Sequence, residues 1–213
     1  MGMDFLEKNT VLFSAAYDYN ILDKEFTGNQ ESGSSSRSRI SQTLLFRVQW
    51  AITNKWSVAV SLPYVWRKET NSTQLTNFND LQSSGIGDLF TQVNYTLFNT
   101  NRSGLLFSGA LKFATGSNNE KNDLDLDLPA DMQPGTGSTD YAFGALYQLS
   151  HIFGGSFYFN ASSTFRINGN GTRFGGKQTF KFGNEFQLIA GFSAEVIFHS
   201  SKVVPALTAQ YRR

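Results

Sequence analysis

One set of residues that could do chemistry in this sequence is the carboxylates of an acidic segment, NNEKNDLDLDLPAD, at positions 118–131. The five carboxylates are Glu120, Asp123, Asp125, Asp127 and Asp131. Oxygen-rich loops of this kind can bind Ca²⁺, but the ligand spacing differs from that of an EF-hand loop. The leucines between the aspartates also indicate a short extended segment. We therefore predict a solvated acidic loop and no metal site.

The remaining residues form no recognisable combination of nucleophile, base and metal ligand. The chain has no cysteine and only two histidines, His151 and His199, both at predicted turns. A zinc site or a histidine-based catalytic site needs more than these two residues. No serine stands in a G-x-S-x-G elbow, and the glycine-rich run GNGTRFGG at 169–176 lacks the Lys-Ser/Thr of a phosphate-binding loop. We therefore predict a protein that is not an enzyme and holds no cofactor.

Composition narrows the class of protein further. Eighteen basic and seventeen acidic residues give a net charge of +1, which argues against a nucleic-acid-binding surface. The twenty phenylalanines favour a β-rich fold. No run of about 18 apolar residues occurs, which excludes a membrane-spanning helix. A membrane-spanning β-barrel remains compatible with the sequence, because its strands alternate and give a weaker hydropathy signal.

A set of β-strands must position these residues, because apolar and polar side chains alternate along most of the chain. The alternation recurs about nine times, at 10–20, 40–52, 56–66, 88–97, 105–113, 141–149, 157–167, 180–198 and 203–211. Many of these strands reach the roughly 9 to 11 residues that cross a bilayer obliquely. Strands of soluble proteins most often have about 5 to 6 residues, so strand length favours the membrane.

The connections between the predicted strands fall into two alternating classes. Short turns are expected at 53–55, 99–103, 152–155 and 199–202. Longer polar loops are expected at 21–39, 68–84, 116–137 and 169–176. Outer-membrane β-barrels show this asymmetry, with tight periplasmic turns at one end and long external loops at the other. We predict an all-β, antiparallel outer-membrane β-barrel of meander topology, with a single domain over residues 1–213.

In such a barrel the apolar face of each strand meets lipid and the polar face lines the lumen. The residues expected in the lumen are Arg47, Gln49, Arg67, Asp88, Gln92, Asn94, Lys112, Asp140, Asn160, Arg166, Lys181, Glu185 and Gln187. The aromatic residues expected in two interfacial girdles are Trp50, Trp56, Tyr64, Trp66, Phe98, Tyr141, Phe157 and Phe198. The nearly balanced charges of the lumen row favour cross-barrel pairing over strong ion selectivity. A salt-bridged plug without conduction fits them equally.

The segment SSGIGDLFTQVNYTLFNT at 83–100 begins one of these strands. We expect Gly85 and Gly87 to let a long external loop turn down into the membrane. Asp88 is then the first lumen-facing residue near the rim. Two roles stay open for it: it pairs with an arginine across the rim, such as Arg67, and does nothing more, or it also screens what enters.

Four short motifs, in order along the chain, resemble the outer-membrane family associated with the meta-cleavage pathway of phenol degradation. They are the strand ending in Leu-Pro-Tyr at 62–64, the strand SSGIGDLFTQVNYTLF, the segment LKFATGS and the segment PGTGSTDYAFGALY, over residues 40–150. The resemblance implies a Gram-negative outer-membrane β-barrel that passively transports small hydrophobic or aromatic compounds. Membrane lipid is then its principal partner. A fold by itself does not establish such a function.

Two departures from that family predict an incomplete barrel. Bacterial single-chain barrels have an even number of strands, whereas about nine are predicted here. The chain also stops at Tyr211-Arg212-Arg213 instead of on an aromatic-ended strand. A further strand within 1–8 is the competing explanation. The start, MGMDFLEKNT, lacks a secretory signal, so either the protein stays in the cell or a signal has been removed.

Two other functions remain open on the sequence. One is a structural or adhesive surface barrel with a closed lumen, whose long loops bind a partner. The other is a soluble β-barrel that binds an apolar ligand inside, with its apolar faces turned inward.

Overall fold

A computed structural model of the chain describes residues 5–23, 26–27, 30–31, 37–71, 80–152, 157–173, 178–181, 183–194, 196–198, 201–203 and 206–213. Strands make up almost all of the regular structure in these ranges, and the one helical segment among them is a 3-10 turn, Ala130–Met132. In the described part of the chain, no helix is long and apolar enough to cross a membrane.

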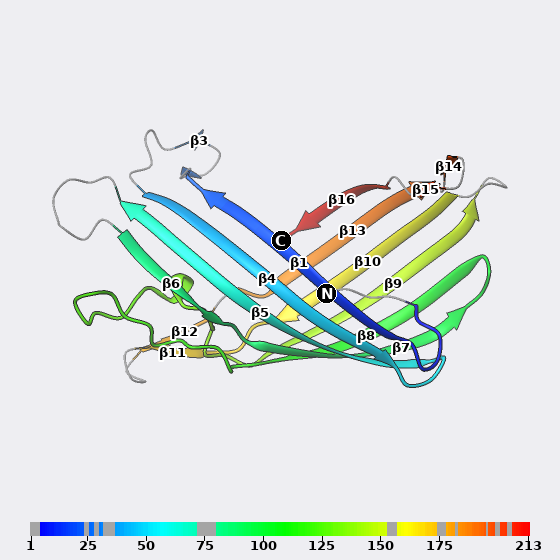
Figure 1. Cartoon of the computed structure of the whole chain (residues 1–213). Coiled ribbons are helices and arrows are strands. Elements are labelled where there is room, and N and C mark those ends of the chain that lie inside the picture. Colours follow the sequence, from blue (N-terminus) through cyan, green and yellow to red (C-terminus); the bar gives the residue numbers. More distant parts are fainter. Residues whose placement is uncertain are drawn as a thin grey trace.

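Nine strands form a continuous antiparallel sheet in the order of the chain (Figure 1). They are β1 (Val11–Leu22), β4 (Arg37–Ala51), β5 (Trp56–Asn71), β7 (Leu89–Asn99), β8 (Ser103–Phe113), β9 (Asp140–Ile152), β10 (Phe157–Ile167), β13 (Glu185–Ala194) and β16 (Ala206–Arg212). A tenth strand, β6 (Asp80–Ile86), pairs with the C-terminal half of β5, and the N-terminal half of β5 pairs with β7. The predicted antiparallel meander is confirmed.

Three short hairpins lie in the connections. β2 (Phe26–Thr27) pairs with β3 (Gln30–Glu31), β11 (Gly171–Arg173) with β12 (Gln178–Phe180), and β14 (Val196–Phe198) with β15 (Ser201–Val203). The tight turns after β4 and β7 lie at one end of the sheet (Figure 1). The longer connections after β1, β5, β8 and β10 leave from the opposite end, which we call the loop end.

These two tight turns carry the same short sequence, Thr-Asn followed by a basic residue. The Thr53 hydroxyl accepts hydrogen bonds from the N–H groups of Lys55 (3.1 Å) and Trp56 (2.9 Å). The Thr100 hydroxyl accepts equivalent bonds from the residues two and three positions later, at 3.4 and 3.0 Å. A threonine oxygen that binds backbone donors stabilises a turn locally, so both hairpins are encoded by their own turn residues.

Two strand boundaries differ from the prediction. β5 extends to Asn71 and β6 begins at Asp80, so residues 68–71 and 80–84 of the predicted loop at 68–84 are strand. The predicted single strand at 180–198 is divided, because β12 and β13 are separate and β14 follows in its own hairpin. Before β13, the Asn168 side chain donates to the carbonyl of Gly183 (2.6 Å) and its N–H donates to the Asn184 side chain (3.2 Å). These side-chain contacts lie just beyond the last ladder pair of β10 and β13, Arg166 with Glu185.

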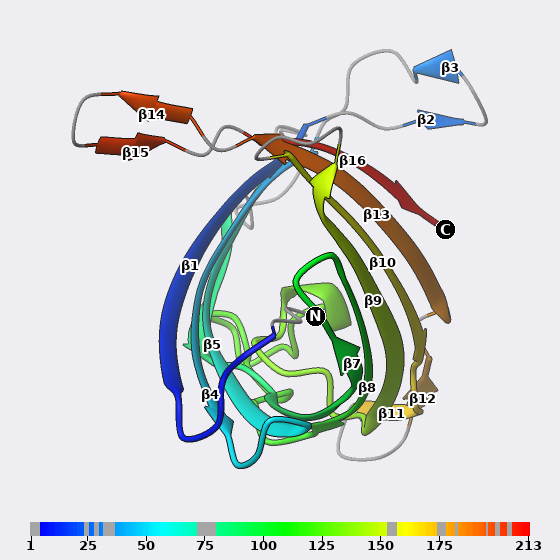
Figure 2. The same cartoon turned by 90° about the vertical axis from the view of Figure 1, so that its right-hand side faces the viewer.

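The sheet curls along its width into an open trough (Figure 2). β1 and β16 form its two edges, and no pairing between them occurs among the described residues. The connection between β8 and β9, residues 114–139, runs inside the trough and is called the inner loop (Figure 2). The concave side of the sheet is therefore the side that contacts the inner loop.

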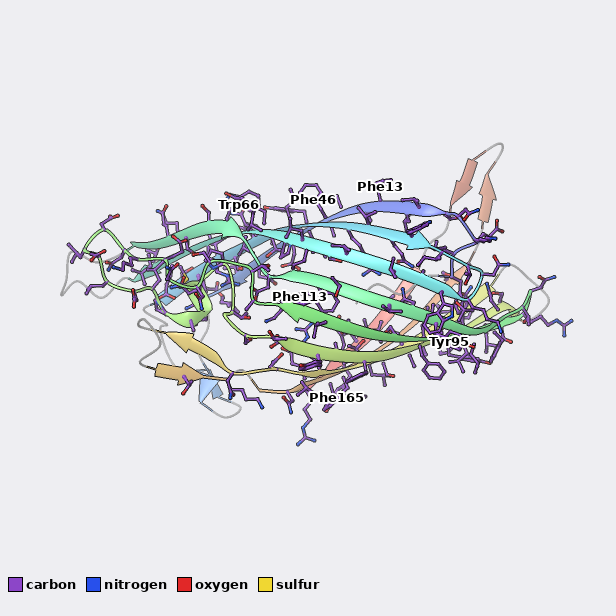
Figure 3. The ribbon with its side chains drawn as sticks, turned by 90° about the horizontal axis from the view of Figure 1, so that it is seen from below. Phe13, Phe46, Trp66, Tyr95, Phe113 and Phe165 are labelled. Atoms are coloured by element: carbon purple, nitrogen blue, oxygen red, sulfur yellow. The ribbon has the colours of Figure 1, made fainter. Side chains whose placement is uncertain are left out.

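Exposure on the two faces of the sheet is the reverse of that in a soluble protein. The convex face carries exposed hydrophobic side chains such as Phe13 (74% exposed) and Phe46 (53%), which project outward in Figure 3. The concave face buries polar side chains, among them Gln49 (0%) and Asn94 (1%). Soluble monomers rarely expose contiguous apolar patches larger than a few hundred Å². The convex face therefore has the character of a surface that something apolar covers.

Candidate functional site

The inner loop holds its own shape on the concave side of the sheet. Leu128 and Gln133 are almost fully buried. The Gln133 carboxamide accepts a hydrogen bond from the N–H of Glu120 (2.8 Å) and donates to the carbonyl of Glu120 (3.0 Å). It also donates to the carbonyl of Leu128 (3.1 Å). The N–H of Gly135 donates to the carbonyl of Ser117 (2.7 Å), which closes the loop at its base.

Asp88 fastens both arms of the inner loop to the sheet. It lies between β6 and β7 and is 7% exposed. One carboxylate oxygen accepts the N–H of Gly116 (3.0 Å), and the other accepts the N–H (2.9 Å) and the hydroxyl (2.6 Å) of Thr136. Gly116 belongs to the arm that leaves β8, and Thr136 belongs to the arm that returns to β9. One carboxylate therefore joins three segments of the chain.

Lys112 on β8 completes a buried charge cluster around Asp88. Its ammonium lies 3.4 Å from the carboxylate of Asp88 and 2.5 Å from that of Asp140, the first residue of β9. Asp140 also accepts hydrogen bonds from the Ser138 hydroxyl (3.0 Å) and the N–H of Gly169 (2.9 Å). Two carboxylates thus share one ammonium, and each is further stabilised by hydroxyl and backbone donors, as buried charges require.

The predicted pairing of Asp88 with Arg67 is wrong. The Arg67 guanidinium donates to the backbone carbonyl of Gln133 in the inner loop. Asp88 lies at the junction of β6 and β7, and the partners that the structure brings to it are the inner loop and Lys112. The pairing depends on where the inner loop lies, which strand alternation does not encode.

A second ion-pair cluster, which sequence reasoning missed, ties the inner loop to the loop end of the sheet. Arg39 on β4 binds Glu69 on the neighbouring strand β5 and Asp131 of the inner loop, the latter at 2.7 Å. Arg39 is in phase with Arg47 along β4, and Glu69 is in phase with Arg67 along β5. Extending the polar row by this alternation would have found both residues.

Three glycines let the inner loop approach the sheet closely. A β-carbon added to Gly135 would lie 2.4 Å from the carbonyl carbon of Gly116, and one added to Gly116 would lie 2.7 Å from that of Gly87. A β-carbon on Gly87 would lie 2.9 Å from Cγ of Pro63 on β5. Gly87 is therefore required for backbone approach. The prediction that a long loop turns into the membrane at Gly85 and Gly87 is wrong, because β6 already begins at Asp80.

Nearer the tight turns, the concave face carries a chain of hydrogen-bonded polar side chains. Gln92 donates to Asn94 (2.5 Å), and Asn94 donates to the Ser57 hydroxyl (3.0 Å). Gln49 donates to the same hydroxyl (3.2 Å). Arg47 donates to Gln49 (3.0 Å) and to Gln92 (3.3 Å). The structure therefore brings four of the predicted lumen residues together in one network.

The other predicted lumen residues lie apart from this network. Arg166 on β10 is 3.5 Å from Glu185 on β13, and Gln187 lies half-buried on the same strand as Glu185. Lys181 is an error of the prediction, because it is exposed between β12 and β13, outside the main sheet. The backbone of Asn160 lies in β10, and its side chain is outside the described residues.

Four of the predicted girdle residues lie near strand ends, whereas Tyr64 and Trp66 lie inside β5. The structure describes the side chains of these six. They are Trp50, Trp56, Tyr64, Trp66, Phe98 and Tyr141, of which all but the half-buried Tyr64 are exposed. The Trp56 ring packs against Tyr95 with centroids 4.7 Å apart, and Tyr64 packs against Trp66 at 4.5 Å. An irregularity in β7 places Phe98 opposite Leu105 of β8. The side chains of Phe157 and Phe198 are outside the described residues.

The acidic segment forms the outer part of the inner loop. Asp123 and Asp125 are exposed, and Asp125 pairs with Lys121 at 2.8 Å. This hydrogen bond raises the pKa of Lys121 above its ordinary value. Within the described ranges, no three His, Asp or Glu residues are grouped as metal ligands. The two histidines add nothing here, since His199 and the side chain of His151 lie outside those ranges.

A cavity of about 450 Å³ opens among β4, β5 and β6 near the loop end. Its lining residues include Trp66, Arg67, Lys68, Gln82 and Glu120. Charges of both signs line the cavity, so it gives no strong preference for cations or anions.

The comparisons with known proteins support the fold. No family model and no curated protein matches the chain. Among solved structures, the chain is similar to an outer membrane channel from Pseudomonas putida F1, with a TM-score of 0.69 and 14% sequence identity over 99% of this chain and 76% of that one. At this identity the likeness shows the fold alone. The predicted all-β antiparallel fold, like that of an outer membrane channel, is confirmed. The outer-membrane location and membership of the phenol-degradation family stay predictions.

Proposed function

We propose that the protein is a passive channel of the bacterial outer membrane for small molecules. The observation that carries this proposal is the reversed exposure of the sheet, with an apolar convex face and a buried polar concave face. In a bilayer, lipid covers the apolar face of a barrel, and the polar face lines the lumen. The fold shared with the outer membrane channel of Pseudomonas putida F1 supports the same location.

The charges of the concave face support weakly selective, passive passage. Lys112 lies between two carboxylates, and Arg39 likewise binds two. Paired charges leave little net field to select ions. We propose small hydrophobic or aromatic compounds as the solutes, an assignment that rests on the family resemblance of residues 40–150. The proposal includes no catalytic step.

We further propose that additional strands close the barrel between β1 and β16. Eight antiparallel pairings separate these two edge strands, so they run in the same direction. Antiparallel closure therefore requires an odd number of added strands. A sheet embedded in lipid leaves no edge unpaired, because nothing in the hydrocarbon can satisfy its N–H and C=O groups.

Single-channel recording in planar bilayers tests the proposed function. We expect discrete conductance steps and a small reversal potential across a salt gradient. Swelling of proteoliposomes in an uncharged phenol, compared with a sugar of similar size, tests the solute class. A folded protein that gives no conductance would refute the channel, and equal swelling in the two solutes would refute the preference for aromatic compounds.

A surface barrel with a closed lumen is the second candidate. It is favoured by the inner loop, which occupies part of the concave side and buries Leu128 and Met132 there. The same recordings distinguish the two candidates, because a closed barrel stays silent. The exposed apolar side chains of the convex face argue against a soluble ligand-binding barrel. A stable monomer in detergent-free buffer would restore that candidate.

A further inference from the structure

We propose that the inner loop is a fixed constriction of the passage, and that Asp88 is the positioning residue that holds it there. This inference rests on the proposed channel function and concerns how wide the channel is. The middle of the inner loop, residues 118–134, is called the lobe. Seen along the trough, the inner loop lies within the curl of the sheet, on the concave side where a solute would pass (Figure 2).

The Asp88 carboxylate suits this role because both of its oxygens accept hydrogen bonds. Three donors converge on its two oxygens, namely the N–H of Gly116 and the N–H and hydroxyl of Thr136. An asparagine offers only one oxygen, so at least one backbone N–H would face an amide NH₂ instead of an acceptor. Because the site is buried, an unsatisfied donor there is costly.

The Thr136 hydroxyl links the clamp to the charge cluster. It donates to Asp88, and it accepts a hydrogen bond from the ammonium of Lys112. Lys112 is held in turn by Asp140 at 2.5 Å. The two ends of the inner loop, where it leaves β8 and where it enters β9, are therefore locked to each other and to Asp88.

Further contacts hold the lobe at points remote from its base. These contacts make the lobe a fixed element and not a hinged lid. Ser83 of β6 donates to the carbonyl of Met132, Arg67 donates to the carbonyl of Gln133, and Arg39 binds Asp131. At its base, the backbones of Gly87, Gly116 and Gly135 approach one another so closely that an added β-carbon would clash. The size of the passage at this level is therefore set by the position of the lobe.

Three variants test the proposal. In the first, a two-residue Asn-Gly turn replaces residues 118–134, which is feasible because the flanking Ser117 and Gly135 already share a hydrogen bond of 2.7 Å. The second is Asp88→Asn, with Thr136→Val as a milder substitution that removes one of the three donors. The matched control is Asp123→Asn, which changes an exposed aspartate of the same loop.

Two measurements are made on each full-length variant. One is single-channel conductance. The other is the rate at which an impermeant maleimide, added to intact cells, labels Cys introduced by Ser108→Cys. Ser108 is buried on the concave face, four residues from Lys112 toward the tight turns. The chain has no native cysteine, so labelling reports access past the lobe whether or not ions flow.

We expect the lobe replacement to raise conductance about twofold or more, because the narrowest section governs conduction, and to speed labelling. Asp88→Asn should shift both measurements in the same direction, and Asp123→Asn should leave both unchanged. A folded lobe replacement that labels and conducts like the wild type would overturn the proposal. If the lobe replacement changes both measurements while Asp88→Asn and Thr136→Val behave like the control, the positioning role of Asp88 is wrong and the constriction stands. A silent wild type whose lobe replacement conducts or labels faster would refute the open channel while supporting the constriction.

Discussion

Arginine in place of Val60 tests whether the convex face lies in lipid. Val60 on β5 is 45% exposed on that face, and it pairs with Val48 of β4 and Thr91 of β7. If water covered this face, Val60→Arg would change the free energy of unfolding by less than about 0.5 kcal/mol, as surface substitutions usually do. In a bilayer the same substitution places a cation in hydrocarbon.

The geometry of β5 gives the expected magnitude. Val60 lies midway between the girdle residues Trp56 and Tyr64, which are about 26 Å apart along a strand that rises about 3.3 Å per residue. With a tilt of about 40°, this corresponds to about 20 Å of membrane height, comparable with the apolar band of about 25 Å in such barrels. Val60 is then near the midplane, where arginine costs about 2–4 kcal/mol. That cost is roughly a 30- to 700-fold change in the folding equilibrium.

Reversible urea unfolding from phospholipid vesicles, followed by tryptophan fluorescence, measures this difference. Ile52→Arg is the matched control, because Ile52 is an exposed apolar residue at a tight turn and a cation near the interface costs only about 0–1 kcal/mol. Equal unfolding free energies for the two variants would refute the assignment of the convex face to lipid. The channel proposal would then lose its main support.

Two further predictions concern contacts inside the trough. Gly135→Ala is expected to cost about 1–3 kcal/mol of unfolding free energy, because the new β-carbon would lie 2.4 Å from the backbone of Gly116. Gly109→Ala, with no atom within 4 Å of the added carbon, is its control, and matching urea midpoints would contradict the close approach. Asn94→Ala is expected to cost about 1–3 kcal/mol, because its buried partners lose a hydrogen bond. An equal effect of Asn99→Ala, at an exposed strand end, would show that the network does not stabilise the sheet.

Much of the fold could be predicted because antiparallel hairpins are local structures. The period of two marks each strand, and a Thr-Asn turn joins β4 to β5 and β7 to β8 within the residues concerned. The prediction failed at 180–198, where alternation continues but the strand does not. There Asn168, from a preceding connection, binds Gly183 and Asn184, a contact that no pattern within the strand reveals.

The sequence predicted which side chains of the candidate site share a face of the sheet, but it did not predict which of them pair. Alternation assigned Arg47 and Gln92 to the same face, and the structure joins them by a hydrogen bond of 3.3 Å. It did not show that Asp88 would bind the inner loop, because the short alternation of aspartate and leucine within residues 114–139 does not say where that segment lies. Arg39 was missed only because the polar row was not extended far enough along β4.

The sequence by itself determined most of the strands, their antiparallel order and the chemical character of each face, because a period of two and short turns act between neighbouring residues. The tertiary structure alone decided that the inner loop lies inside the trough, held by Asp88, Lys112 and Asp140. It also showed why Gly87, Gly116 and Gly135 are glycines, since their backbones meet across segments distant in the chain. The physical reason is that burial and close approach depend on long-range packing, which local patterns do not contain.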